Sequence, residues 1–177
     1  MTPGADAPAA VGAPGAAGAP GAPAVGEDLG PRLDGLVLPN THGTPVPLAG
    51  LRGAPALLVL LPYAFSRTCT SELGELRDGL GSLEATGVRV LAVSCDPVPA
   101  LRAWAEQERV GLDLLSDFWP HGAAARALGA FDEVNGVARR GSFLLDAGGV
   151  LRWSVLGPSG RARPFDAYRA AVADLVG

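Results

Sequence analysis

The stretch that decides the fold is Ala56-Leu-Leu-Val-Leu-Leu61-Pro-Tyr-Ala-Phe-Ser66-Arg-Thr-Cys69, where an apolar run leads into an amphipathic segment. The run is short, continuous and bounded by prolines, which is typical of a central strand covered on both faces. From Thr70 onward, apolar residues recur at helical spacing, which predicts a helix; they are Leu73, Leu76, Leu80 and Leu83. Cys69 therefore lies among the unpaired backbone N–H groups at the positive end of a helix dipole, an environment that favours the thiolate.

Strands and helices alternate along the rest of the chain, and this order predicts the fold class. The expected elements are a hairpin with arms at 36–38 and 46–48, a strand at 88–94, a helix from Pro99, a strand at 112–115, a short helix at 122–128, a second hairpin with arms at 142–146 and 150–155, and a helix from Pro164. Alternation implies parallel strands joined by crossover helices, and the second hairpin adds antiparallel strands. We therefore expect an α/β protein with a thioredoxin-like fold, its central mixed β-sheet flanked by helices.

Length and charge narrow the classes of function. The chain has 177 residues, which is enough for one domain with a sizeable core. Residues 1–26 are nearly all alanine, glycine and proline, so we expect a disordered tail followed by one domain at 27–177. The net charge is −4 and lysine is absent, which argues against nucleic acid as a partner. No apolar run is long enough for a membrane span, and no secretion signal is evident, so we expect a cytoplasmic protein without a membrane partner.

Metal and cofactor sites are not expected. The chain has two cysteines and two histidines, and they are too widely spaced for the paired clusters that zinc sites use. The sequence also lacks a glycine-rich phosphate loop. The chemistry must therefore come from the side chains themselves, with Cys69 as the first candidate.

The motif Pro62-x-x-x-Ser66-x-x-Cys69 resembles the active-site motif of peroxiredoxins, the thiol-specific antioxidant and alkyl hydroperoxide reductase family. Residues 30–177 are especially similar to the small one-cysteine group typified by alkyl hydroperoxide reductase E, through Cys69-Thr-Ser-Glu72 and the stretch at 114–122. The resemblance implies a peroxidase that reduces hydrogen peroxide and organic hydroperoxides through a sulfenic acid. It also implies regeneration by an external thiol (a thioredoxin-like protein, a glutaredoxin-like protein or a small thiol) and a homodimer.

Four residues are expected to carry the catalysis: Cys69 as nucleophile, Ser66, Pro62 and Arg140. Ser66 can hydrogen-bond the sulfur, and the resemblance implies that Pro62 shields the thiolate from water. It also implies that an arginine at the start of a late strand reaches the sulfur, which selects Arg140, with Arg139 as the alternative. A permanently charged guanidinium suits the departing oxygen, which gains negative charge.

Other side chains have open roles. Glu72 can bridge to an arginine or act electrostatically at the helix N-terminus, and Trp119 can line the pocket or belong to the core. Cys95 follows a neighbouring strand and can be either a resolving cysteine or a spectator; a disulfide with Cys69 needs Cα atoms within about 7 Å.

Two other functions stay open. A thioredoxin-like disulfide oxidoreductase is disfavoured because Ser66 stands where a Cys-x-x-Cys motif needs its first cysteine. A non-enzymatic peroxide sensor or redox relay would also use an oxidisable Cys69. Turnover with added reductant distinguishes an enzyme from a sensor.

Overall fold

A five-stranded mixed β-sheet forms the centre of the molecule in the computed structural model, which describes residues 21–157 and 161–177. The strands run in the order β5-β4-β3-β8-β9. They are β3 (Ala56–Leu60), β4 (Arg89–Ser94), β5 (Asp113–Ser116), β8 (Gly141–Leu145) and β9 (Leu151–Leu156). The first three are parallel, whereas β8 pairs antiparallel with β3, and β9 pairs antiparallel with β8. The expected α/β fold with a mixed sheet is confirmed.

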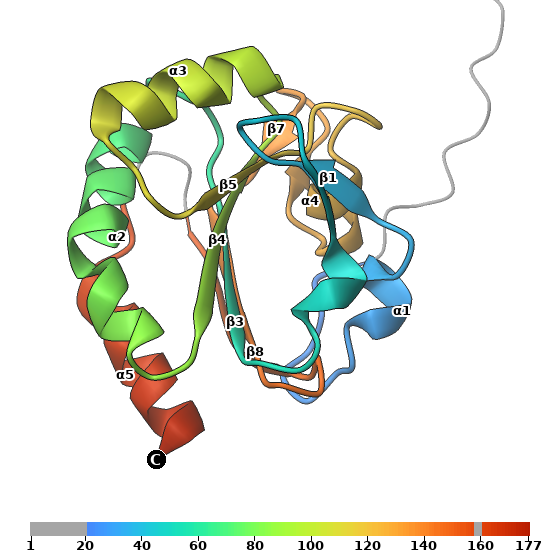
Figure 1. Cartoon of the computed structure of the whole chain (residues 1–177). Helices are drawn as coiled ribbons and strands as arrows, with labels where there is room; N and C mark the ends of the chain where they lie inside the picture. Colours follow the sequence, from blue (N-terminus) through green and yellow to red (C-terminus); the bar gives the residue numbers. More distant parts are fainter. Residues whose placement is uncertain (1–20, 158–160) are drawn as a thin grey trace, which may run out of the picture.

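Helices cover both faces of the sheet (Figure 1). One face carries α2 (Arg67–Glu84), α3 (Val98–Glu108) and α5 (Phe165–Val176). The other face carries α1 (Gly30–Leu33), the 3₁₀ turn η1 (Leu48–Leu51), α4 (Ala123–Ala127) and the hairpin of β1 (Val37–Pro39) and β2 (Pro45–Pro47). The sheet therefore separates two hydrophobic layers.

Residue alternation along β3 explains this layering. All five residues of β3 are buried, as the continuous apolar run predicts. Leu57 and Val59 belong to the layer beneath α2, α3 and α5, whereas Leu58 and Leu60 belong to the opposite layer. Successive side chains of a strand point to opposite faces, so one short run supplies apolar contacts to both layers.

The helix that carries the candidate nucleophile begins earlier than the sequence predicts. The apolar stripe indicates a start at Thr70, but α2 begins at Arg67. Ser66 has extended backbone angles, and its hydroxyl oxygen accepts the Cys69 N–H at 3.3 Å, so it acts as the N-cap. Cys69 is consequently in the first turn of α2 rather than before it.

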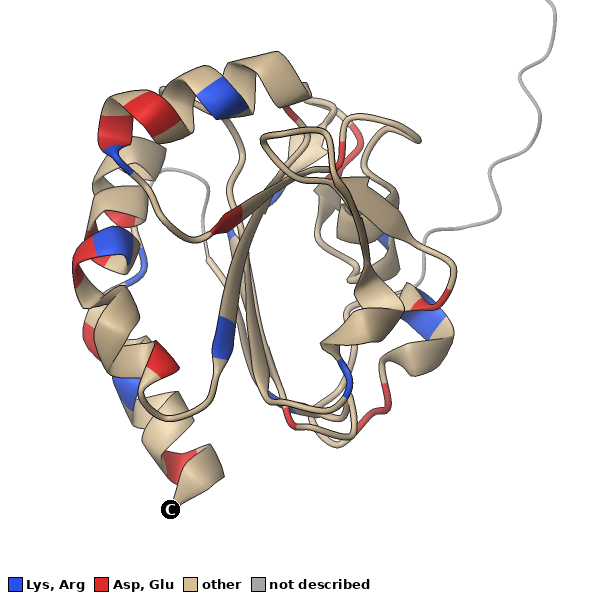
Figure 2. Ribbon diagram, viewed as in Figure 1, with Lys and Arg blue, Asp and Glu red and all other residues tan. Residues whose placement is uncertain are grey.

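The outer and inner faces of the helices differ in character. Residues of both charge signs are spread over α2, α3 and α5 (Figure 2), while their inward residues join the apolar layer.

The α2–α5 contact is close at Gly79, where an added Cβ would lie only 2.0 Å from the Phe165 ring. Glycine at this position allows α5 to pack directly on α2.

The N-terminal segment contacts the domain further upstream than its composition suggests. Most of the expected tail, residues 1–20, lies outside the described residues. Within 21–26, Pro23 is buried, and the Gly26 N–H donates to the Leu151 carbonyl at 2.7 Å. Arg32 also donates to the Gly21 carbonyl at 2.9 Å. The expected boundary at residue 26 therefore falls inside a segment that packs against the domain.

Candidate active site

Cys69 is held at the carboxyl end of β3, in the first turn of α2. The chain leaves β3 at Leu60, passes through a loop containing Pro62, and enters α2 at its Ser66 cap. The Trp104 Nε1–H of α3 donates to the Thr70 hydroxyl at 3.1 Å and so ties the start of α2 to its neighbouring helix. The Cys69 side chain is fully buried, with 0% of its surface exposed. A reactant must therefore present a small reactive end to reach the sulfur.

Arg140 is the cation that contacts the candidate nucleophile, as the sequence predicts. The pairing of β3 with β8 places Leu60 opposite Gly141, so the residue before β8 lies beside the end of β3. From there, Arg140 Nη2 donates to Cys69 Sγ at 3.3 Å. Burial opposes the guanidinium charge, but the nearby Cys69 and Glu72 outweigh it and raise the pKa of Arg140. Arg140 thus remains charged beside the sulfur.

Glu72 bridges two arginines, which resolves the alternatives left open by the sequence. One carboxylate oxygen accepts from Arg140 Nη1. The other accepts from Arg163 Nε at 2.5 Å and from the Arg163 backbone N–H at 3.2 Å. Arg163 Nη2 also donates to the Leu60 carbonyl at 3.0 Å. Glu72 therefore fixes the position of Arg140, and Arg163 fixes Glu72 against the end of β3.

Arg163 is a site residue that the sequence analysis missed, although its position contained a signal. It directly precedes Pro164, the cap residue of α5, and a cation is electrostatically unfavourable at the N-terminus of a helix. An arginine that is only 4% exposed at such a position needs an anionic partner. That partner is Glu72.

The four buried charged groups balance when the sulfur is ionised. With Cys69 as a thiolate, the site holds two anions and two cations, the second anion being Glu72 and the cations Arg140 and Arg163. With a neutral thiol, one positive charge is left without a counter-charge in a region that excludes water, and such a charge is costly. The buried cluster is therefore neutral overall with a Cys69 thiolate and carries one net positive charge with a Cys69 thiol.

The loop before α2 is held by Asp96, whose role the sequence did not indicate. Its carboxylate accepts the Ala64 N–H at 2.7 Å and the Ser94 hydroxyl at 2.5 Å. The Asp96 carbonyl accepts the Ser116 hydroxyl at 2.6 Å. The next loop residue, Phe65, has a positive φ of 62°, which is strained for a bulky side chain. Such a conformation persists only where its surroundings hold it, and Asp96 supplies one of those restraints.

Comparison with known proteins agrees with this geometry. Residues 30–154 match the AhpC/TSA family. This chain belongs to the AhpC/TSA family. Alkyl hydroperoxide reductase E of Mycobacterium tuberculosis (strain ATCC 25618 / H37Rv) is 42% identical over 131 residues, which cover 73% of this chain and 86% of the relative. The expected resemblance to alkyl hydroperoxide reductase E is confirmed.

Solved structures support the same assignment. The crystal structure of Enterococcus faecalis AhpC superposes with a TM-score of 0.71 at 26% identity, covering 78% of this chain and 86% of that one. Peroxidoxin BcpB from Mycobacterium tuberculosis superposes with a TM-score of 0.68 at 28% identity, covering 79% and 90%. The mixed sheet and its helices are thus the family fold.

In this AhpC/TSA-family chain, the second cysteine lies across the sheet from the first. Cys69 belongs to the layer beneath α2, α3 and α5, whereas Cys95 belongs to the layer beneath α1 and α4. Both thiols are free. Burial, with a further contribution from the Asp117 carboxylate, raises the pKa of the Cys95 thiol to about 12. Cys95 is therefore a poor nucleophile at neutral pH and does not share a face with Cys69.

The remaining predicted residues are not members of the charged cluster of Cys69, Glu72, Arg140 and Arg163. Pro62 is buried at the end of β3, where it flanks the site. Trp119 is 77% exposed, in the loop between β5 and α4. Arg139 is exposed, whereas Arg140 is buried in the cluster. The Ser66 hydroxyl was expected to hydrogen-bond the Cys69 sulfur. In the structure, its oxygen accepts the Cys69 backbone N–H instead.

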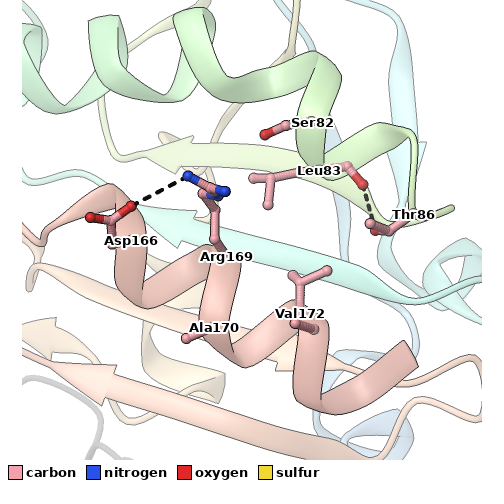
Figure 3. A pocket seen from close by; sticks show the side chains of 8 residues that line it. Ser82, Leu83, Thr86, Asp166, Arg169, Ala170 and Val172 are labelled. Carbon is pink, nitrogen blue, oxygen red and sulfur yellow. Dashed lines mark hydrogen bonds and ion pairs between the residues drawn. The ribbon is translucent and has the colours of Figure 1, made fainter. Parts of the chain in front are cut away.

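A pocket of about 560 Å³ lies between α2 and α5 (Figure 3). It is bordered by Ser82, Thr86 and Arg169. Ser82 is 13 residues beyond Cys69 on the same helix, a distance of about 20 Å at 1.5 Å per residue. This pocket is not part of the site.

Among the described residues, no helix is long and apolar enough to cross a membrane, and no group of three potential metal ligands occurs.

Proposed function

We propose that this AhpC/TSA-family protein reduces hydroperoxides with Cys69 as the nucleophile. The observation that carries the proposal is the contact of Arg140 Nη2 with Cys69 Sγ at 3.3 Å in a buried, charge-balanced cluster. The same guanidinium that stabilises the thiolate lies where charge develops on the departing oxygen. Relatives of the family that carry the names alkyl hydroperoxide reductase and peroxiredoxin support the same function.

The oxidation step uses the sulfur and one oxygen of the peroxide. The Cys69 thiolate attacks the terminal oxygen of ROOH, the S–O bond forms, and the O–O bond breaks. The electron pair leaves on RO⁻, which takes a proton to give ROH, while Cys69 becomes a sulfenic acid. Arg140 stabilises RO⁻ by charge-assisted hydrogen bonding. Glu72 and Arg163 do not react, but they keep Arg140 in place.

The reducing step requires a thiol from outside the chain. A thiol R′SH attacks the sulfenic acid, releases water and leaves a mixed disulfide on Cys69. A second thiol then releases R′SSR′ and restores the Cys69 thiol. The location of Cys95 in the opposite layer supports this external route. The thiol is a thioredoxin-like or glutaredoxin-like protein or a small molecule, and a reducing compartment such as the cytoplasm suits its supply.

We also propose a homodimer formed through the surface near the active site. Exposed aromatic side chains support this assignment, because Phe65 and Phe118 are each 48% exposed and Trp119 is 77% exposed. Large exposed aromatic groups are enriched at protein interfaces. Light scattering of the purified chain should give twice the monomer mass, and a monomer at all concentrations would contradict this part of the proposal.

Mass spectrometry after one equivalent of hydrogen peroxide tests the function directly. The parent should gain one oxygen on Cys69, and Cys95→Ser should gain it equally, whereas Cys69→Ser should not. Added thiol should then remove the oxygen and permit repeated turnover. A protein that is oxidised once and never turns over with any thiol would be a sensor. Equal loss of oxidation in both variants would refute the assignment of Cys69.

A further inference from the structure

A second pocket, of about 380 Å³, lies beside the catalytic cluster. Its walls include Pro62 and Tyr63 from the loop after β3, Asp132 and Asn135 from the hairpin of β6 (Phe131–Asp132) and β7 (Val137–Ala138), and Arg139 and Gly157. Sequence reasoning singled out Arg139, yet the oxidation step gives it no role.

The pocket shares its walls with the immediate neighbours of the reacting groups. Pro62 follows the end of β3, where the chain turns toward Cys69. Arg139 precedes Arg140, and the Gly157 N–H donates to the Arg140 carbonyl at 2.9 Å. Because Cys69 is fully buried, only the reactive end of a molecule fits beside the sulfur. Neither Cys69 nor Arg140 lines the pocket, but Pro62 and Arg139, the neighbour of Arg140, do, so a molecule that reaches the sulfur past Pro62 would place its remainder there.

The charges that line the pocket point to an anionic ligand group. The Arg139 guanidinium is exposed and makes no hydrogen bond or ion pair within residues 21–157 and 161–177. The nearby Asp132 carboxylate is already occupied, since it accepts from the Val134 N–H at 3.0 Å, the Asn135 N–H at 3.1 Å and the Asn135 side-chain amide at 2.7 Å. The pocket therefore offers a planar cation with unused donors, and planar guanidinium matches carboxylate.

We propose that this pocket binds a carboxylate carried by a small reactant of Cys69, with Arg139 as its partner. The proposal rests on the proposed peroxidase function and names the chemistry of its reactants. Two kinds of reactant reach Cys69 in each cycle, the hydroperoxide and the thiol, and a carboxylate on either kind would lie in the same place. Arg139 also offsets the negative charge of Asp132, so its removal should turn the pocket from accepting an anion to repelling one.

The experiment compares matched charged and neutral reagents. Oxidation uses tert-butyl hydroperoxide and an analogue that carries a carboxylate at the end of its alkyl chain. Reduction of the preformed sulfenic acid uses 2-mercaptoethanol and 3-mercaptopropionate. For each pair, the selectivity is the rate constant for the charged reagent divided by that for the neutral one. The variants are Arg139→Gln, Arg139→Lys and, as a matched loss of one exposed arginine far from Cys69, Arg169→Gln.

We expect Arg139→Gln to lower the selectivity roughly threefold to tenfold in at least one arm, as for a partly exposed charge-assisted contact. Arg139→Lys should restore most of it, Arg169→Gln should retain the parental value, and high salt should reduce the parental selectivity. A change confined to oxidation assigns the carboxylate to the hydroperoxide, and a change confined to reduction assigns it to the thiol. Unchanged selectivity in both arms, or an equal change in Arg169→Gln, would overturn the proposal. Failure of the proposed function is distinct, because the parent would then reduce no hydroperoxide.

Discussion

Replacing Arg140 with methionine removes the guanidinium while retaining a flexible side chain of similar length. The Nη2–Sγ separation is 3.3 Å in the parent. Two unit charges at this distance interact by about 5 kcal/mol at an effective dielectric constant of about 20, which is an upper limit for the lost stabilisation of the thiolate. The α2 N-terminus and Ser66 cap remain, so the variant should still ionise, but at higher pH.

The loss of rate should exceed the loss of thiolate. Removing an electrostatic stabiliser of a departing oxygen costs about 10²–10³ in rate in other enzymes. We therefore expect the pH–rate profile of Arg140→Met to move upward in pH and to level off at least 100-fold below the parental plateau, in line with this range. Stopped-flow measurement of hydrogen peroxide reduction over a pH series separates the two effects.

Two controls keep this experiment interpretable. Arg89→Met removes an exposed arginine at the far end of β4 and should retain the parental profile. Circular dichroism must show that Arg140→Met is folded, since Glu72 keeps only Arg163 as its partner. Recovery of the full parental rate once Cys69 is ionised would refute the reasoning, because Arg140 would then act only on the thiol and not on the departing oxygen.

Three further predictions follow from other contacts. Asp96→Ala should slow peroxide reduction on the order of tenfold by releasing the Ala64 N–H, whereas Asp96→Asn keeps an acceptor and should stay near the parental rate; equal rates in both would contradict this positioning role. Burial raises the pKa of Cys95 from 9.0 to about 12, so the unfolded chain loses this thiol proton at lower pH than the folded chain. The melting temperature should therefore fall more steeply between pH 9 and 12 in the parent than in Cys95→Ala. Parallel curves for the two proteins would contradict this prediction. Deleting residues 1–26 should lower the melting temperature by roughly 2–4 °C for each 1 kcal/mol of lost contacts, whereas deleting residues 1–20 should leave it unchanged; equal melting temperatures for the two deletions would contradict this.

The larger elements were predictable because each has a strong local signal. The buried run of β3, the leucine stripe of α2 and the second hairpin are all present where expected. The smaller elements α1, η1 and the β6–β7 hairpin were not predicted. These helices and strands have only two to four residues each, which is too few for a periodic pattern. The start of α2 was placed three residues late because capping, not periodicity, determines it.

The site residues that could be predicted are those marked by a short local motif. The motif around Cys69 and the arginine at the start of β8 are local features, and both are in contact as expected. Arg163 and Asp96 act through partners far away in sequence, with separations of 91 residues to Glu72 and 32 to Ala64. Such partners become neighbours only when the sheet and helices assemble, so no local pattern identifies the partner, even where the position of Arg163 before α5 signals that it needs an anion.

In the proposed reaction, the balance of charges around Cys69 also changes. Conversion of the thiolate into a protonated sulfenic acid removes one of the two anions and leaves Arg140 and Arg163 with Glu72 alone. The oxidised protein thus acquires a net positive centre that the resting protein lacks. A buried cation without a counter-charge attracts the next anion that can reach it. Under the proposed mechanism, the protein would therefore draw in a thiolate most strongly after oxidation of Cys69, and it would lose that attraction once the sulfur is restored.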